Sequence, residues 1–223
     1  MSEKLSEYDI LDEPFIYIYE KALNTMICKE IITMFEMDET KGHGLTGTGF
    51  SPHVKNAINL DIDDAPKWSK IYDLLINELC RNIKRYIKQM ENYSNGLIRQ
   101  TLALNFVQFD NPMIQKYIKN EGKYAYHDDF QADYDKKRYR IFTYIFYLND
   151  VIEGGETEFL FGKYKIKPTT GKLMLFPASW TFPHCGKMPY SDDKYIITGW
   201  IYYNDNEYIN EYVKEYKNNP KNK

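Results

Sequence analysis

The first half of the sequence has one short strand pattern and two helical patterns. Residues 14–20, PFIYIYE, mix β-branched and aromatic residues in weak alternation, which predicts a strand. Asn24 is a suitable N-cap for a helix in the next segment, where apolar residues return at helical intervals. A longer amphipathic helix is predicted over residues 65–92, with Pro66 in its first turn. Residues 41–56, between the helices, are rich in Gly, Thr and Ser and predict a long loop that serves as a lid or binding segment.

The second half of the sequence has the pattern of β-structure. Short runs of β-branched and aromatic residues alternate with Gly, Pro and Asp-Asn punctuation. Helices followed by such strands predict one α+β domain whose sheets form a sandwich or barrel. We divide the chain into a supporting part (1–96), a β-rich core in the same domain (97–205) and a charged tail (206–223). The predicted strands are 97–109, 113–118, 139–148, 155–160, 172–177 and 194–203.

Composition and charge narrow the location and the partners. The 223 residues fit one domain, and a net charge of -3 gives no reason to expect nucleic acid or an anionic membrane as partner. The polar start lacks the features of a secretory signal, and no stretch has the length of a membrane span. Three widely separated cysteines suggest reduced thiols. We therefore expect a cytoplasmic protein. Tyr, Lys, Ile and Asn are abundant, as AT-rich codons would produce, and this composition favours a bacterial or viral source.

Two histidines and one carboxylate are candidate metal ligands. His127 and Asp129 stand one residue apart in the aromatic run YAYHDDF, and non-haem iron prefers such donors, although a polar turn would also explain them. His184 follows the strand predicted at 172–177. Together the three could hold a metal on one face and leave its other positions open. His43 and His53, in the loop, are expected to be exposed to solvent.

A lysine begins the last predicted strand, which is otherwise largely apolar and is expected to be buried. Period-two alternation places Lys194 and Trp200 on the same face, and both faces of this strand are largely apolar. A buried lysine normally has a carboxylate to pair with. The alternative is that Lys194 extends to the surface beside Asp192 and Asp193.

Residues 97–203 resemble the catalytic domain of the prolyl 4-hydroxylases, which are Fe(II)- and 2-oxoglutarate-dependent dioxygenases. The resemblance implies a double-stranded β-helix, or jelly-roll, core with supporting N-terminal helices. Four motifs carry it, in the order and spacing of the family: KYIKNEGKYAYHDD, RIFTYIFYLNDVIEGGETEF, GKLMLFPASW with PHCG, and DDKYIITGWIYY.

The resemblance implies roles for nine residues, which would serve the metal, the co-substrate or the substrate. Two of them also have a structural interpretation: Arg140 could belong to a solvated basic turn, and Trp200 could be a core aromatic residue. The carboxylate at position 129 argues against a halogenase, which leaves that position vacant for halide. The three groups are His127, Asp129 and His184 for Fe(II); Lys194, Tyr117 and Thr157 for 2-oxoglutarate; and Arg140, Tyr124 and Trp200 for the substrate.

The activity that the resemblance implies is hydroxylation of a proline in a peptide or protein, with release of succinate and CO2. Fe(II), 2-oxoglutarate and O2 would be required, with ascorbate as the reductant. The same chemistry on a free amino acid, lysine or a small molecule is the first alternative. A second is an inactive module that keeps the barrel for protein interaction. No nucleic-acid or membrane partner is expected.

Overall fold

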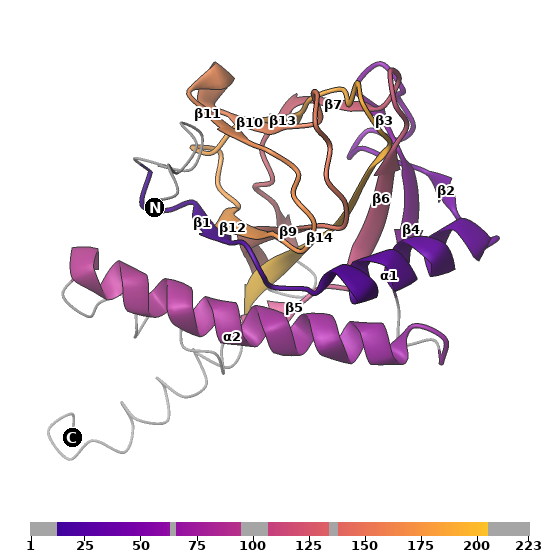
Figure 1. Cartoon of the computed structure of the whole chain (residues 1–223). Coiled ribbons are helices and arrows are strands. Elements are labelled where there is room, and N and C mark those ends of the chain that lie inside the picture. The colour runs from indigo at the N-terminus through magenta and orange to yellow at the C-terminus, as the bar shows by residue number, and fades with distance from the viewer. Residues whose placement is uncertain (1–12, 63–65, 95–106, 134–137, 205–223) are drawn as a thin grey trace, which may run out of the picture.

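The computed structural model describes residues 13–62, 66–94, 107–133 and 138–204, which form two antiparallel sheets flanked by helices (Figure 1). The larger sheet follows the order β1-β12-β9-β14-β6-β4-β2, with β5 and β8 pairing β14 and β9, and the smaller sheet follows β11-β10-β13-β7-β3. This arrangement confirms the predicted jelly-roll.

The larger sheet contains β1 (Tyr17–Tyr19), β2 (Gly42–His43), β4 (Ile58–Asp61), β5 (Val107–Phe109), β6 (Met113–Tyr117), β8 (Ala132–Asp133), β9 (Arg138–Tyr147), β12 (Leu173–Pro177) and β14 (Lys194–Asn204). The smaller contains β3 (Lys55–Asn56), β7 (Lys123–His127), β10 (Thr157–Phe159), β11 (Tyr164–Ile166) and β13 (His184–Gly186), with a short 3₁₀ helix, η2 (Leu160–Gly162), after β10.

Two α-helices lie on the outer side of the larger sheet (Figure 1). Helix α1 (Thr25–Met37) starts as predicted, because the side chain of Asn24 accepts a hydrogen bond of 2.9 Å from the backbone N–H of Ile27. Helix α2 (Ser69–Ser94) begins later than predicted, since Pro66 lies in the turn before it. Both helices pack their apolar stripes, including the fully buried Leu75, against the sheet. No helix in the described part of the protein is long and apolar enough to cross a membrane.

The alternation of side chains along β9 separates two hydrophobic cores. Tyr144 and Phe146 point outward and join the core between the larger sheet and the helices. Ile145 and Tyr147 point inward and join the core between the two sheets. Both sets are apolar because β9 is covered on both faces, which explains why its sequence shows little alternation.

A β-bulge interrupts this alternation at the start of β9. Arg140 pairs with Tyr202 of β14 and Phe142 pairs with Ile201, so Ile141 is the extra residue. Phe142 packs in the outer core, as the alternation of β9 requires. Arg140 and Thr143, three residues apart, nevertheless both line the cavity between the sheets. The bulge therefore brings a residue to the interior that strict alternation would place outside.

Several predicted boundaries need correction. The loop predicted at 41–56 begins and ends in strands, since β2 pairs with β4 and β3 pairs with β7. The short strands β4, β7, β8, β11 and β13 were not predicted. Of the strand predicted at 97–109 only β5 falls among the described residues, and the tail at 206–223 lies outside them. Strands β1, β2 and β4 of the supporting part share one sheet with strands of the predicted core. All three cysteines are free.

Candidate active site

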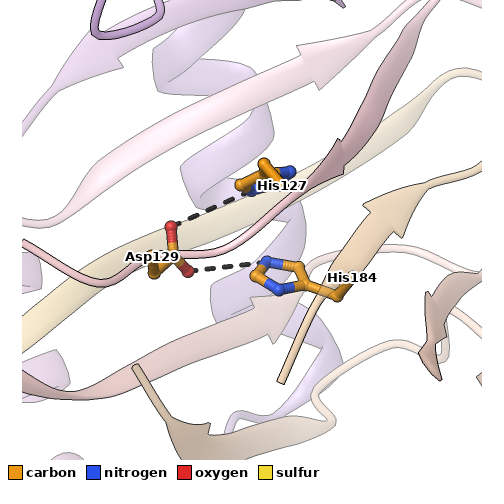
Figure 2. A group of neighbouring side chains, drawn as sticks. All are labelled: His127, Asp129 and His184. Carbon is orange, nitrogen blue, oxygen red and sulfur yellow. Dashed lines mark ion pairs between the residues drawn. The ribbon is translucent and has the colours of Figure 1, made fainter. Parts of the chain in front are cut away.

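The two histidines and the aspartate converge inside the jelly-roll, although 57 positions separate His127 from His184 in the sequence. His127 ends β7, Asp129 follows it, and His184 begins the neighbouring strand β13, where it pairs with His127 (Figure 2). The Nε2 atoms of His127 and His184 lie 3.8 and 3.5 Å from the two carboxylate oxygens of Asp129. One ligand atom from each residue lies within 4.8 Å of the others. The geometry fits one metal ion bound from one side.

Backbone carbonyls orient both imidazoles. Nδ1 of His127 donates to the carbonyl of Ala125 over 2.9 Å, and Nδ1 of His184 donates to that of Phe182 over 3.1 Å. In each ring the proton is thereby placed on Nδ1, and the lone pair of Nε2 is directed toward Asp129. Burial, followed by the proximity of His184, lowers the pKa of His127 to about 4, so this ring is neutral at pH 7. Neutral imidazole is the form that binds metal.

The carboxylate of Asp129 is held ready in its charged form. Burial alone would raise its pKa, but His184, His127 and a hydrogen bond from Thr143 outweigh burial and lower it. The Thr143 hydroxyl donates to Oδ2 over 2.7 Å, and both residues are buried. Thr143 reaches this position from the inward face of β9. Sequence reasoning did not single it out, because a threonine in a strand is unremarkable without the contact.

Lys194 lines the same cavity and does not extend to the surface. Its side chain is 1% exposed, and its Nζ donates to the carbonyl of Gly155 over 2.8 Å and sits 4.8 Å above the ring of Tyr117. Burial lowers the pKa of the Lys194 ammonium to about 8. Gly155 has a φ of +74°, and a Cβ there would approach Val151 and Lys194 within 3.1 and 3.4 Å. The GGET segment thus needs glycine to fold its carbonyl against this lysine.

The hydroxyls of Tyr117 and Thr157 line the cavity near Lys194 but have protein partners. Tyr117 donates to Oε1 of Gln115 over 2.7 Å. The hydroxyls of Thr157 and Tyr147 lie 2.7 Å apart. If Tyr147 is the donor, the hydrogen of Thr157 remains available to a ligand in the cavity.

The three residues with an expected substrate role also line the cavity. The guanidinium of Arg140 stacks on Trp200 at 3.5 Å from the ring centroid, and its Nε donates to the hydroxyl of Tyr202 over 3.1 Å. Arg140 is therefore not part of a solvated turn. Tyr124 stacks on the ring of His127, with centroids 3.6 Å apart. The indole Nε1 of Trp200 is buried without a hydrogen-bond partner among the described residues.

The cavity has a volume of about 740 Å³ and brings all nine predicted residues together. Residues 42, 43 and 45–47 of the predicted loop line it as well, so that loop lies over the site. His43 is exposed, as expected, yet it belongs to this lining, whereas His53 does not. Asp128, which has an exposed side chain, also lines the cavity. Lys55, which is not among the nine predicted residues, is a further buried lysine of the cavity.

Three solved structures illustrate what the fold resembles. A viral collagen prolyl hydroxylase from Paramecium Bursaria Chlorella virus-1, in its 2-oxoglutarate complex, is 19% identical, with a TM-score of 0.59 over 85% of this chain and 96% of that one. A prolyl hydroxylase from Trichoplax adhaerens, bound to a hypoxia inducible factor oxygen degradation domain peptide fragment, is 20% identical, with a TM-score of 0.63 over 87% and 86%. A Pseudomonas putida prolyl-4-hydroxylase is 16% identical, with a TM-score of 0.58 over 83% and 91%. At these identities the likeness establishes the fold.

The sequence itself matches a family at the same place. No curated protein matches it significantly in sequence. Residues 112–202 match the model of the 2OG-Fe(II) oxygenase superfamily, and this segment contains the three candidate metal ligands and the other six predicted residues. Over this segment the chain is similar to the 2OG-Fe(II) oxygenases, and it has the jelly-roll fold of the prolyl hydroxylases.

Proposed function

We propose that the protein hydroxylates a proline residue in a peptide or protein, consuming 2-oxoglutarate and O2 and releasing succinate and CO2. The observation that supports this most is the joining, in one cavity, of a metal-binding set, a buried lysine and an arginine stacked on tryptophan. A volume of about 740 Å³ is sufficient for a small dicarboxylate and one segment of an extended peptide. Prolyl hydroxylases share the fold, and one of them was solved with a peptide bound.

The ligand set fits Fe(II) in type, charge and arrangement. Two neutral imidazoles and one carboxylate leave a bound Fe(II) with one net positive charge, which favours the dianion 2-oxoglutarate. When bound, iron, 2-oxoglutarate and O2 supply the oxidation, in which one oxygen atom enters succinate and the other enters the substrate C–H bond. The protein supplies the geometry and excludes water.

In this proposal Lys194 binds the distal carboxylate of 2-oxoglutarate. Its ammonium is buried and has only a backbone carbonyl as a hydrogen-bond acceptor among the described residues. The hydroxyl of Thr157 would donate a second hydrogen bond to the co-substrate, and that of Tyr117 would do so after rotation away from Gln115.

The substrate would bind along Arg140, Trp200 and Tyr124. The stack on Trp200 fixes the guanidinium plane of Arg140, so its remaining N–H groups can donate to a backbone carbonyl without reading a side chain. A proline-rich segment suits such a groove because it is already extended and loses little entropy on docking. The loop 42–47 would close over the bound peptide and exclude water.

The decisive experiment incubates the enzyme with Fe(II), 2-oxoglutarate, ascorbate and a panel of proline-containing peptides. We expect a peptide to gain one oxygen atom on proline, located by tandem mass spectrometry, with a matching amount of succinate. His184→Ala is the matched control and should give neither product.

Other outcomes separate the alternatives. If succinate formation is coupled to hydroxylation of free proline, lysine or another small molecule, and no peptide product forms, the proposed reaction is retained but the proposed substrate class is wrong. Iron binding without any succinate, coupled or uncoupled, would favour a binding module.

A further inference from the structure

Lys55 is a second buried ammonium group in the cavity that contains the proposed co-substrate site. It lies on the edge strand β3, pairs with Tyr124 of β7, and is 4% exposed. Its Nζ sits 4.8 Å from the centroid of the Tyr124 ring. Among the described residues, Nζ has no hydrogen-bond acceptor and no carboxylate at ion-pair distance. Lys55 therefore presents an uncompensated charge to the cavity.

The other two buried lysines in the described part of the protein have such partners. Lys172, which is 5% exposed, lies 3.4 Å from a carboxylate oxygen of Glu20 and donates to a backbone carbonyl. Lys194 donates to the carbonyl of Gly155. Lys55 is stabilised only at longer range, by Asp129 and Asp61, and burial lowers its pKa to about 8. Because Asp129 shares its charge with a bound metal, the loaded site would leave Lys55 still less compensated.

A second unsatisfied polar atom lies close to Lys55. Oδ1 of Asn59 is buried and accepts no hydrogen bond from the described residues, although Asn59 lines the cavity. A Cβ placed on Gly44 of the covering loop would lie 3.1 Å from Cε of Lys55 and 3.2 Å from Oδ1 of Asn59. The loop thus covers both groups, and only a glycine at position 44 leaves them this close. An ammonium donor and an amide acceptor therefore lie together beneath the loop, and a ligand would reach the Asn59 oxygen when the loop moves aside.

We propose that Lys55 and Asn59 form a carboxylate subsite for the substrate, filled by an acidic residue or by a peptide's terminal carboxylate near the hydroxylated proline. In either case the same substrate residue offers a carboxylate to Lys55 and a backbone N–H to the free oxygen of Asn59. This inference rests on the proposed function. It adds the requirement that the substrate carry a negative charge, which Arg140 does not impose because it would bind a backbone carbonyl.

Two competing ligands fit the wall less well. A peptide carbonyl would leave the charge of Lys55 uncompensated in a buried position. A phosphate dianion would exceed the single charge of Lys55 and would face the carboxylates of Asp61 and Asp128, which line the same cavity. A carboxylate matches the charge of Lys55.

The test measures peptide binding apart from turnover. Enzyme loaded with Fe(II) and 2-oxoglutarate is titrated without O2, by calorimetry, with proline peptides that carry Glu, Gln or phosphoserine at each position flanking the proline. A second set ends in a free carboxylate or in a carboxamide and so distinguishes the two sources. Lys55→Met keeps the apolar stem, Lys55→Arg keeps the charge, and Lys172→Met is the control outside the cavity. Melting temperatures verify that each variant folds.

We expect the native enzyme to bind a carboxylate peptide at least about tenfold more tightly than its neutral partner. Lys55→Met should abolish this preference while changing the affinity for the neutral peptide less than about threefold, and Lys55→Arg should restore part of it. Four results would overturn the subsite. The native enzyme could bind charged and neutral peptides equally, prefer phosphoserine, or bind no peptide, or Lys55→Met could weaken the affinity for charged and neutral peptides equally. Carboxylate preference without hydroxylation would instead refute the proposed function, and hydroxylation without the preference would refute only the subsite.

Discussion

Replacing Lys194 by methionine should weaken the binding of 2-oxoglutarate and, at the same time, stabilise the protein without ligand. The native ammonium is 1% exposed, and its pKa falls from 10.5 to about 8 because burial disfavours the charge, which Glu156 offsets only in part. Methionine has a similar length and no charge. The substitution therefore separates the effect of the buried ammonium on protein stability from its proposed role in binding 2-oxoglutarate.

The magnitude of the stability change follows from the pKa. A fall from 10.5 to about 8 means that keeping the amine charged at pH 7 costs the folded protein roughly 3 kcal/mol. The loss of the hydrogen bond to the Gly155 carbonyl offsets about 1–2 kcal/mol of this. We therefore expect Lys194→Met to raise the free energy of unfolding by about 1–2 kcal/mol, or the melting temperature by a few degrees.

The change of protein stability with pH is a second, independent test of the buried ammonium. Since the folded pKa lies below the unfolded one, the unfolded protein binds more protons between about pH 8 and 10, and native stability should rise with pH in that range. Lys55, whose pKa is also lowered to about 8, contributes in the same direction. Lys194→Met should retain only the Lys55 part of the rise. Denaturant unfolding of the metal-free protein at several pH values measures both effects.

The effect on 2-oxoglutarate should be much larger. Removing one partner of a buried ion pair costs roughly 3–5 kcal/mol, which corresponds to roughly two to three orders of magnitude in the dissociation constant. Calorimetry with Fe(II) present and O2 absent measures it, and the Michaelis constant from succinate formation should follow. Lys172→Met, which removes another buried lysine that lies outside the cavity, should leave 2-oxoglutarate binding unchanged. Unchanged affinity in Lys194→Met would refute the assigned role.

Three further substitutions test the rest of the site. His184→Ala should abolish turnover and weaken Fe(II) uptake strongly, as measured by competition with a chelator; an active variant would refute the ligand assignment. Thr143→Val removes the 2.7 Å hydrogen bond to Asp129 and should weaken Fe(II) binding by about 10–100-fold, with unchanged affinity as the contrary result. Arg140→Ala should weaken peptide binding but leave uncoupled 2-oxoglutarate decarboxylation nearly intact, and equal loss of both would indicate a structural role.

The long, strongly patterned elements could be predicted from the sequence, whereas the short ones could not. Both helices were found because apolar residues return at the helical period, and β9 and β14 were found because they are long runs of β-branched and aromatic residues. Strands β7 and β13, which carry the two histidines, have five and three residues and mix polar with aromatic side chains. Their pairing is fixed by neighbouring strands, and no local pattern announces it.

The candidate site shows the same division between local pattern and tertiary contact. All nine predicted residues line the cavity, because the motifs place residues of the right type in the order of the family. Thr143 was missed, and Lys55 was not among the nine residues. The role of each depends on a tertiary contact: Thr143 donates a hydrogen bond to Asp129, and Lys55 lies beside the ring of Tyr124. Such contacts exist only in the folded protein.

The bulge at Ile141 gives the protein a single point at which its two chemical tasks can be uncoupled. Upstream of it, β9 carries Arg140; downstream, the strand carries Thr143, which donates a hydrogen bond to Asp129 of the proposed metal site. If Ile141 joined the regular pairing, the bulge would disappear and Arg140 would turn to the opposite face, while the strand beyond it keeps its phase. Peptide selection could then be lost or exchanged by a change confined to the bulge, with the proposed iron site inherited intact.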